Sequence, residues 1–198
     1  MIVRRNAAIV LLGTALMLST HAQAQDNDLA TAANQASSTT GLAGLLRAQV
    51  LLDRANFSPG EIDGRARSNQ PRAVNGYQRA QRLPVTGTLD AATWAALDAG
   101  AAPVLVGYTL TAEDVGAAYS TLPKDMVEKS KRKALGFESL HEALGERFHA
   151  SPALLKQLNP GADFSKAGTS LQVPNVADAG ALPKAAKVVV DKSDSTLS

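Results

Sequence analysis

Residues 45–97 have the sequence LLRAQVLLDRANFSPGEIDGRARSNQPRAVNGYQRAQRLPVTGTLDAATWAAL, and this stretch decides the fold of the first half of the chain. It contains two copies of one device, a glycine-containing turn that leads into a helix, at residues 59–64 and 84–90. In each copy glycine permits a tight turn, an aliphatic residue points inward and an aspartate follows it. Asp90 occupies the N-cap position of the helix that carries Trp94. The pattern predicts a three-helix module over residues 42–99.

The spacing of apolar residues places the three helices. The first extends from about residue 41 to residue 55, where leucine and valine recur at helical intervals. The second begins near residues 68–69, with Pro71 in its first turn, where the missing N–H costs nothing. The third brings Trp94 to the same core, a position we favour over an exposed platform for stacking sugars. The expected inward face of the second helix comprises Ala73, Val74, Tyr77 and either Ala80 or Gln81.

The stretch contains Asp63-Gly64, Tyr77-Gln78 and Thr93-Trp94 at a characteristic spacing. In this pattern it resembles the three-helix peptidoglycan-binding domain found beside many bacterial cell-wall enzymes. The resemblance implies that the turn Asp63-Gly64-Arg65, with Tyr77 and Gln78 nearby, contacts the ligand. The sequence departs from the family pattern at Arg67 and Arg82, where glycine is frequent, and at Gln70, where threonine is frequent. The matching positions are Asp63-Gly64, Ala73-Val74, Tyr77-Gln78, Leu83, Thr86-Gly87, Leu89-Asp90, Thr93-Trp94 and Leu97.

The first 24 residues have the features of a signal peptide. Arg4 and Arg5 precede an apolar run over residues 7–18, and Ala22-Gln23-Ala24 fits the small-x-small rule for cleavage after Ala24. The prediction is a bacterial protein that is periplasmic or secreted, with no stable membrane anchor after cleavage. An uncleaved N-terminal anchor is the alternative. Residues 25–41 are rich in Ala, Ser, Thr, Asn and Gln, and they are expected to form a flexible linker.

Charge and cysteine content exclude several classes of function. Lys and Arg number 20 and Asp and Glu 18, so that without Arg4 and Arg5 residues 25–198 carry 18 of each and no net charge. A neutral chain lacks the broad positive field of a nucleic-acid-binding protein. Because the chain has no cysteine, it has neither disulfides nor a cysteine nucleophile.

The segment between the two halves contains a strand and an insertion. Residues 106–111 are expected to form a strand, and Thr111-x-x-Asp114 fits a capping box. A helix is expected to open at residues 123–128 and to close in a basic run, residues 129–133, before Gly136. The basic run has two interpretations. The simpler interpretation is that these cations stabilise the negative end of the helix dipole. The alternative is that they bind an anionic partner.

Leu144, Ser151, Leu155 and Asn159 form a second recurring pattern, which continues to Pro174. In this pattern residues 105–176 resemble LysM, a small β-α-α-β carbohydrate-binding domain, with an insertion over residues 112–137. Ser151-Pro152 fits a helix start, with Ser at the N-cap and Pro at the first position. The resemblance implies that the loop Asn159-Pro160-Gly161 contributes to a sugar site. The matching residues are Leu144, Phe148, Ser151, Leu155, Asn159, Gly168, Leu171, Val173 and Pro174, whereas His141 replaces the usual aliphatic residue.

The two halves together resemble the N-terminal half of certain YkuD-type L,D-transpeptidases. Within the tail, residues 177–198, the segment 187–193 resembles the opening strand of their catalytic domain, and we expect it to fray without a sheet to join. The leading hypothesis is an exported, non-catalytic, monomeric protein that binds peptidoglycan and needs no cofactor. One alternative is a truncated L,D-transpeptidase, and another is an accessory or regulatory partner of a cell-wall enzyme.

Three patterns that suggest catalysis or metal binding have simpler explanations, so no catalytic or metal-ligating residue is predicted. His141-Glu142 opens a zinc motif, but the next histidine is His149, about 12 Å further along a helix. Ser130-x-x-Lys133 lies in the basic run and no K-T-G follows. Glu61, Asp63 and Asp90 could act as acid and base, but turn and cap roles explain them.

Overall fold

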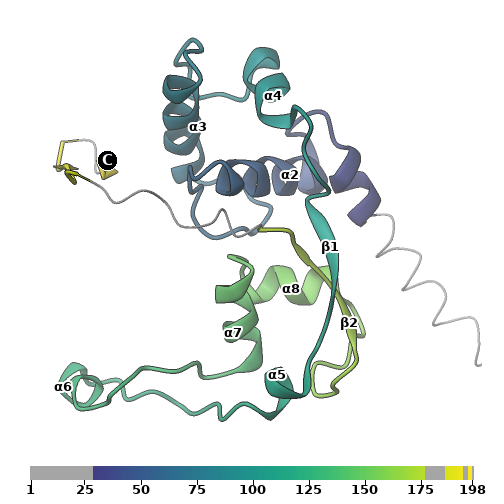
Figure 1. Cartoon of the computed structure of the whole chain (residues 1–198), viewed down its shortest axis with the longest axis vertical. Helices are drawn as coiled ribbons and strands as arrows, with labels where there is room; N and C mark the ends of the chain where they lie inside the picture. The colour runs from purple at the N-terminus through teal and green to yellow at the C-terminus, as the bar shows by residue number, and fades with distance from the viewer. Residues whose placement is uncertain (1–28, 177–185, 194–195, 198) are drawn as a thin grey trace, which may run out of the picture.

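The computed structural model describes residues 29–176, 186–193 and 196–197, so the predicted signal peptide lies outside the described residues. The three predicted helices of the first half are present as α2 (Gly41–Arg54), α3 (Asn69–Ala80) and α4 (Ala91–Asp98). In Figure 1, α3 and α4 stand side by side above α2. The predicted N-cap is confirmed, because the Asp90 carboxylate accepts a hydrogen bond from the Thr93 N–H at 2.8 Å.

Helix α2 is central, because consecutive residues from Leu46 to Leu52 are all buried. A helix that is buried all round its circumference lies in the interior of a fold rather than on its surface. On α3 the predicted inward residues Ala73, Val74 and Tyr77 are buried. The predicted fourth inward position is wrong, since both Ala80 and Gln81 are exposed. Gln78 is buried in their place, because its amide bonds the turn before α4.

Residues 29–35 are helical, and this corrects the prediction of a flexible linker over residues 25–41. Ala33 is fully buried against the core. The Asn34 side chain accepts hydrogen bonds from the N–H groups of Val104 (2.7 Å) and Leu105 (3.0 Å), and donates one to the Leu105 carbonyl. The small polar side chains that suggested a linker therefore permit close docking instead.

The second half joins two strands around two helices. Strand β1 (Leu105–Thr109) pairs antiparallel with β2 (Ser170–Pro174), and Gly107 lies opposite Gln172. Helices α7 (Leu140–Arg147) and α8 (Pro152–Leu158) lie between them in sequence, and the Ser151 side chain caps α8 as predicted. The described part of the chain is mostly helical with this small antiparallel sheet, as expected for the fold class.

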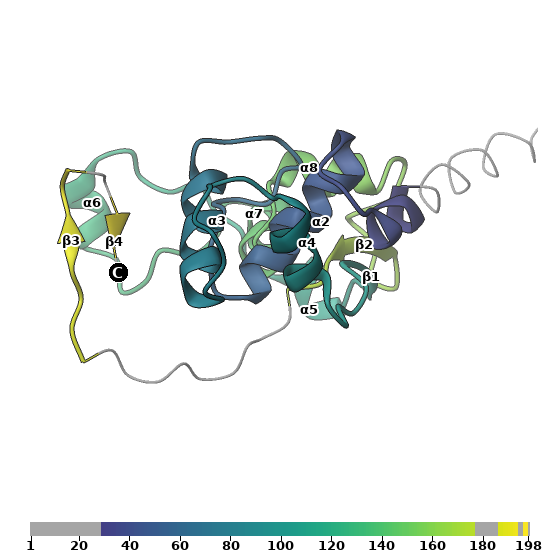
Figure 2. The same ribbon diagram turned by 90° about the horizontal axis from the view of Figure 1, so that it is seen from above.

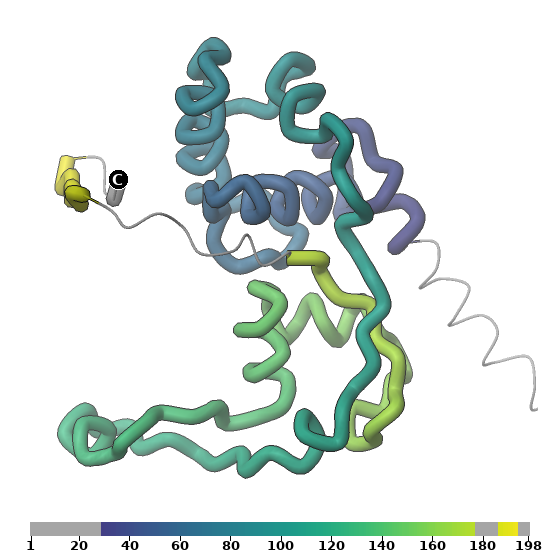
Figure 3. The backbone as a smooth tube through the Cα atoms, in the orientation of Figure 1, coloured from purple at the N-terminus to yellow at the C-terminus, as the bar shows by residue number. Residues whose placement is uncertain are grey.

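The insertion forms two short helices. The predicted capping box is confirmed at the start of α5 (Ala112–Gly116), where Thr111 and Asp114 bond each other's N–H groups. Helix α6 (Met126–Ser130) is shorter than predicted and has no buried residue. The smooth trace in Figure 3 shows the chain running out from α5 to α6 and returning to α7.

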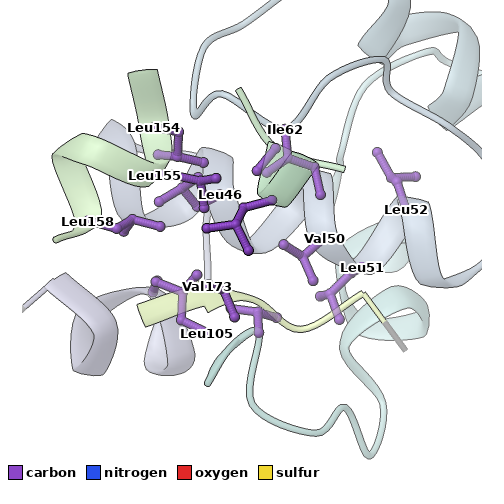
Figure 4. Packing of buried hydrophobic residues seen from close by; sticks show 14 of the residues in the cluster. Leu46, Val50, Leu51, Leu52, Ile62, Leu105, Leu154, Leu155, Leu158 and Val173 are labelled. Carbon is purple, nitrogen blue, oxygen red and sulfur yellow. The ribbon is translucent and has the colours of Figure 1, made fainter. Parts of the chain in front are cut away.

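The two halves share one hydrophobic core. Figure 4 shows Leu46 of α2 beside Leu155 of α8, and Val50 and Leu154 belong to the same cluster; all four are 0–2% exposed. Val173 of β2 belongs to the same cluster. The sequence boundaries at residues 42–99 and 105–176 therefore separate two packing partners rather than two separate cores.

The tail contains one small strand pair, β3 (Val190–Asp191) with β4 (Thr196–Leu197). It lies apart from α2, α3 and α4 in both views of Figures 1 and 2. Of the predicted strand over residues 187–193, only Val190 and Asp191 form a strand. This strand pairs with β4 within the tail, whereas the sequence predicted no partner. Because Val188, Val189 and Val190 are all more than 40% exposed, the pair buries little apolar surface.

Candidate functional site

The two halves meet at Ile62, which lies in the turn between α2 and α3. The Ile62 N–H donates to the His149 carbonyl at 2.8 Å, and the Ile62 carbonyl accepts from the Ser151 N–H at 2.9 Å. These bonds form a parallel bridge between Ile62 and Ala150. The Ile62 side chain is fully buried in the shared core. The turn of the first half is therefore fixed directly to the α7–α8 turn of the second.

A cleft of about 570 Å³ opens at this junction. Its size falls within the usual range of small-molecule sites, about 300–1,000 Å³. Both halves contribute to its walls, so it exists only when they are packed together. The lining residues are Asp53, Ser58, Gly60 and Glu61 from the first half, and Glu142, Gly145, Glu146, His149, Ala150 and Pro152 from the second.

Two positions in the wall of the cleft require glycine. Gly60 has φ +90°, a left-handed conformation that a side chain would strain. A Cβ at Gly145 would stand 2.8 Å from the Ala150 carbonyl oxygen, closer than real Cβ atoms approach backbone. The α7 helix can therefore approach the α7–α8 turn closely only with glycine at this position.

Acidic side chains dominate the cleft. Four of its lining residues carry carboxylates, and His149 is the only basic side chain among them. The Asp53 carboxylate lies 2.8 Å from His149 Nδ1, which pairs the two groups across the junction. Carboxylates accept strong hydrogen bonds from N–H and ammonium groups. The cleft is thus suited to a ligand that carries such donors and unsuited to an anion.

The residues predicted to bind ligand in the first half are mostly structural. Asp63 is 8% exposed and accepts hydrogen bonds from Arg65 N (2.9 Å), Arg67 Nε (2.7 Å) and Gln49 Nε2 (3.2 Å). Burial alone would raise the pKa of Asp63, but these hydrogen bonds outweigh it and hold the pKa below its usual value. Gly64, buried beside it, donates its N–H to Gln49 Oε1 at 2.8 Å.

Gln78 and Tyr77 are equally enclosed. The fully buried Gln78 amide donates to Thr86 Oγ1, Thr93 Oγ1 and the Thr88 carbonyl, and accepts from the N–H groups of Thr86 and Gly87, all within 3.0 Å. Tyr77 is 5% exposed, and its ring meets Phe57 edge-on at 5.8 Å between centroids. Neither side chain is free to contact a ligand, so among the five predicted residues of this half only Arg65 is exposed.

The loop predicted to bind ligand in the second half, residues 159–161, also contains both buried and exposed residues. Asn159 is 7% exposed and joins α8 to β2, because its amide donates to the Leu155 and Gln172 carbonyls and accepts from the Gln172 N–H. Pro160 and Gly161 are exposed. They lie outside the lining of the junction cleft, so the structure does not bring them together with its acidic residues.

A second, smaller pocket of about 300 Å³ lies between β1, the insertion and α7. The Asp114 carboxylate accepts from the Tyr108 hydroxyl at 2.6 Å and from Arg147 at 2.8 Å. Burial would raise the pKa of Asp114, but hydrogen bonds from Tyr108, the Thr111 N–H and Arg147 outweigh it and lower the pKa to about 2. Tyr119 and Phe137 also line this pocket, so it presents aromatic faces beside a fixed ion pair.

The remaining candidates from the sequence have structural roles. Ser130 donates its hydroxyl to the Val127 carbonyl at 2.7 Å, within α6. The His141 ring packs on Phe164 at 4.5 Å between centroids. Among the described residues, no group of three or more His, Cys, Asp or Glu side chains could hold a metal ion. Sequence reasoning missed Asp53 and Glu146. It considered Glu142 only as part of a zinc motif, and it explained Glu61 by a turn role rather than by acid–base chemistry.

Comparison with known families identifies the first half. Residues 43–97 match the family model described as "Putative peptidoglycan binding domain". The matched range begins within α2 and includes α3 and all but the last residue of α4. No curated protein matches the chain. Residues 43–97 are therefore a peptidoglycan-binding domain, which supports cell-wall binding and a location at the cell wall. In the part of the chain that the structure describes, no helix is long and apolar enough to span a membrane.

Proposed function

We propose that this chain is an exported protein that binds peptidoglycan and performs no chemistry of its own. The observation that carries the proposal is the family match at residues 43–97. The signal-peptide features of residues 1–24 support export, and the absence of cysteine supports a non-catalytic role relative to the L,D-transpeptidases that the chain resembles.

The junction cleft is the proposed site of contact. Peptidoglycan stem peptides offer amide N–H groups and, where they are not cross-linked, free amino groups. Glu61 of the first half and Glu146 of the second both line this cleft, and both are exposed. Charge-assisted hydrogen bonds from an amino group to such carboxylates are about twice as strong as neutral ones. We therefore infer that the cleft binds the amino-bearing part of a stem peptide.

The second half is proposed to add contacts with the glycan. When α5 and α6 of the insertion are set aside, its order of β1, α7, α8 and β2 supports the resemblance to LysM. The exposed Pro160 and Gly161 lie in the loop that this resemblance implicates. The pocket beside Tyr108 supplies aromatic faces of the kind that stack on sugars. On this proposal the two halves bind different chemical parts of one polymer.

A second candidate function is the delivery of a catalytic domain. The resemblance of residues 187–193 to the opening strand of a YkuD-type catalytic domain favours it. Sequencing the DNA beyond the codon for Ser198 tests this candidate. A segment that encodes a cysteine nucleophile beside a histidine, in frame or shifted, would support it, and its absence would count against it.

Sedimentation with insoluble peptidoglycan tests the proposed function. The purified chain should be retained at moderate salt, and the double substitution of Glu61→Gln and Glu146→Gln should weaken binding by roughly thirtyfold or more. Each Gln replaces a charged hydrogen bond, which contributes about 1.5–3 kcal/mol, by a neutral one of about 0.5–1.5 kcal/mol. The control pair is Glu128→Gln with Glu138→Gln, which removes the same charge outside both the junction cleft and the pocket beside Tyr108.

The outcomes separate the function from the site. Failure of the unmodified chain to sediment with peptidoglycan would reject the function. Retention that is equally insensitive to both pairs of substitutions would keep the function and reject the junction cleft as its site.

A further inference from the structure

One part of the molecule lies outside the junction cleft: the arm, defined here as residues 120–137, of which only Phe137 at its base lines the pocket beside Tyr108. Its base is closed by a hydrogen bond from the Ser120 N–H to the Phe137 carbonyl at 3.4 Å. Beyond this base, helix α6 lies at the far end of the loop, away from the rest of the molecule (Figures 1 and 3). No residue of α6 is buried. The arm therefore contributes nothing to the shared core.

Positive charge is concentrated in the arm. It carries five of the cations in the sequence and only two carboxylates, a net charge of +3, although residues 25–198 as a whole are neutral. Of the five cations of the arm, all of them described, only Lys131 has a salt-bridge partner, Glu128 at 2.5 Å. The cations left without a side-chain partner in the described structure are Lys124, Lys129, Arg132 and Lys133.

Apolar side chains are exposed in the same segment. Met126 is 73% exposed and Val127 62%, the first two residues of α6. Leu135, 52% exposed, lies on the returning part of the arm. An exposed methionine–valine pair is unfavourable in water, and nothing in the described structure covers it. The arm thus presents apolar side chains at its tip beside unpaired cations.

Helix-dipole stabilisation does not explain this arrangement. Helix α6 has only five residues and ends at Ser130, so Arg132 and Lys133 lie beyond it. Dipole effects fall off within the last turn. A dipole role would also leave the exposure of Met126 and Val127 without a reason.

We propose that the arm docks on an anionic lipid surface. Cations within reach of such a surface attract its headgroups, while small apolar side chains enter the interface between headgroups and acyl chains. A lipid surface needs no complementary cavity, which suits a convex loop tip. A specific protein partner would bury about 800 Å² on each side, more than two apolar side chains at a tip provide. The chain would then bind the cell wall through its body and the membrane surface through the arm.

Vesicle flotation of the full chain tests this proposal. Vesicles of equal parts phosphatidylglycerol and phosphatidylcholine should carry the protein upward, and pure phosphatidylcholine vesicles should not. Substituting Lys129, Lys131, Arg132 and Lys133 together by Gln should reduce binding at least a hundredfold, because each cation near an anionic surface contributes about fivefold. Met126→Ser with Val127→Ser should reduce binding several-fold even at unchanged charge.

The matched control removes four exposed cations of the first half, Arg65, Arg72, Arg79 and Arg82, by substitution with Gln. It should float like the unmodified chain, and residues 1–24 contribute the same background to every variant. Because no arm helix residue is buried, circular dichroism should show that the arm variants stay folded. Equal losses in arm and control variants, or equal flotation with both lipids, would overturn the proposal. So would retention on insoluble peptidoglycan, rather than on vesicles, that depends on the arm cations.

Discussion

Replacing Ile62 with alanine tests whether the two halves of the chain fold as one unit. The Ile62 side chain is fully buried in the shared core, and its backbone bonds both His149 and Ser151. The substitution leaves those backbone groups in place and removes three carbon atoms, each of which contributes about 0.8 kcal/mol when buried. Adding the cavity left behind, we expect a loss of about 3–4 kcal/mol in the free energy of unfolding. At about 2–4 °C per kcal/mol, the melting temperature should fall by roughly 6–16 °C.

Two probes report the halves separately. Trp94 is the only tryptophan in the sequence, so its fluorescence follows α4, while amide hydrogen exchange in α8 and β2 follows the second half. Both signals should shift together, since a shared core unfolds cooperatively. The control Val85→Ala, at a side chain that is 48% exposed, should change the melting temperature by little. Unchanged protection of α8 and β2 beside an early Trp94 transition would refute the shared core.

Three further substitutions follow from buried polar groups. Gln78→Ala should lower the free energy of unfolding, measured by chemical denaturation, by about 3 kcal/mol, because five polar groups lose a hydrogen bond. A loss below about 1 kcal/mol would contradict that network. Arg47→Ala should lower the free energy of unfolding by roughly 3 kcal/mol, because Arg47 pairs with Asp98 and donates to the Asn34 carbonyl at 2.7 Å. The same substitution should speed hydrogen exchange in residues 29–35, and unchanged exchange there would count against this role. In the folded chain the pKa of Asp114 is lowered from 3.8 to about 2, so its carboxylate stabilises the fold above about pH 4. This contribution, about 2 kcal/mol, is lost as the pH falls toward 2. In Asp114→Asn, urea unfolding should show a shallower loss of stability across that range, and an unchanged slope would rule the contribution out.

Local structure was predictable where a few neighbouring residues determine it. The caps at Asp90, Thr111 and Ser151 were predicted, and each accepts its hydrogen bond in the structure. Such caps depend on side chains within three residues of the helix start. Helix α6 was predicted too long, because the basic run continues past Ser130 without any apolar residue that faces a core.

The candidate site was not predictable for a different reason. Asp53 and His149 are 96 residues apart and meet only because Ile62 bridges to Ala150. No local pattern contains that information. Conversely, Asp63 and Gln78 belong to a family pattern, and the pattern alone does not show whether such polar residues face a ligand or the interior. Their hydrogen-bond partners in turns and on α2 decide the question, and those lie up to 15 residues away.

The pairing of β1 with β2 has a consequence for the order of events during synthesis. Leu105 lies opposite Pro174, so about seventy residues must leave the ribosome after β1 before its partner strand exists. Until then Leu46 and Val50 lack α8 and Val173, which complete their surroundings. Contacts so distant in sequence form late and slowly. The peptidoglycan-binding half therefore emerges first, and its apolar surface stays exposed until the C-terminal strand is synthesised. A chaperone that recognises exposed leucine would bind the chain during that interval.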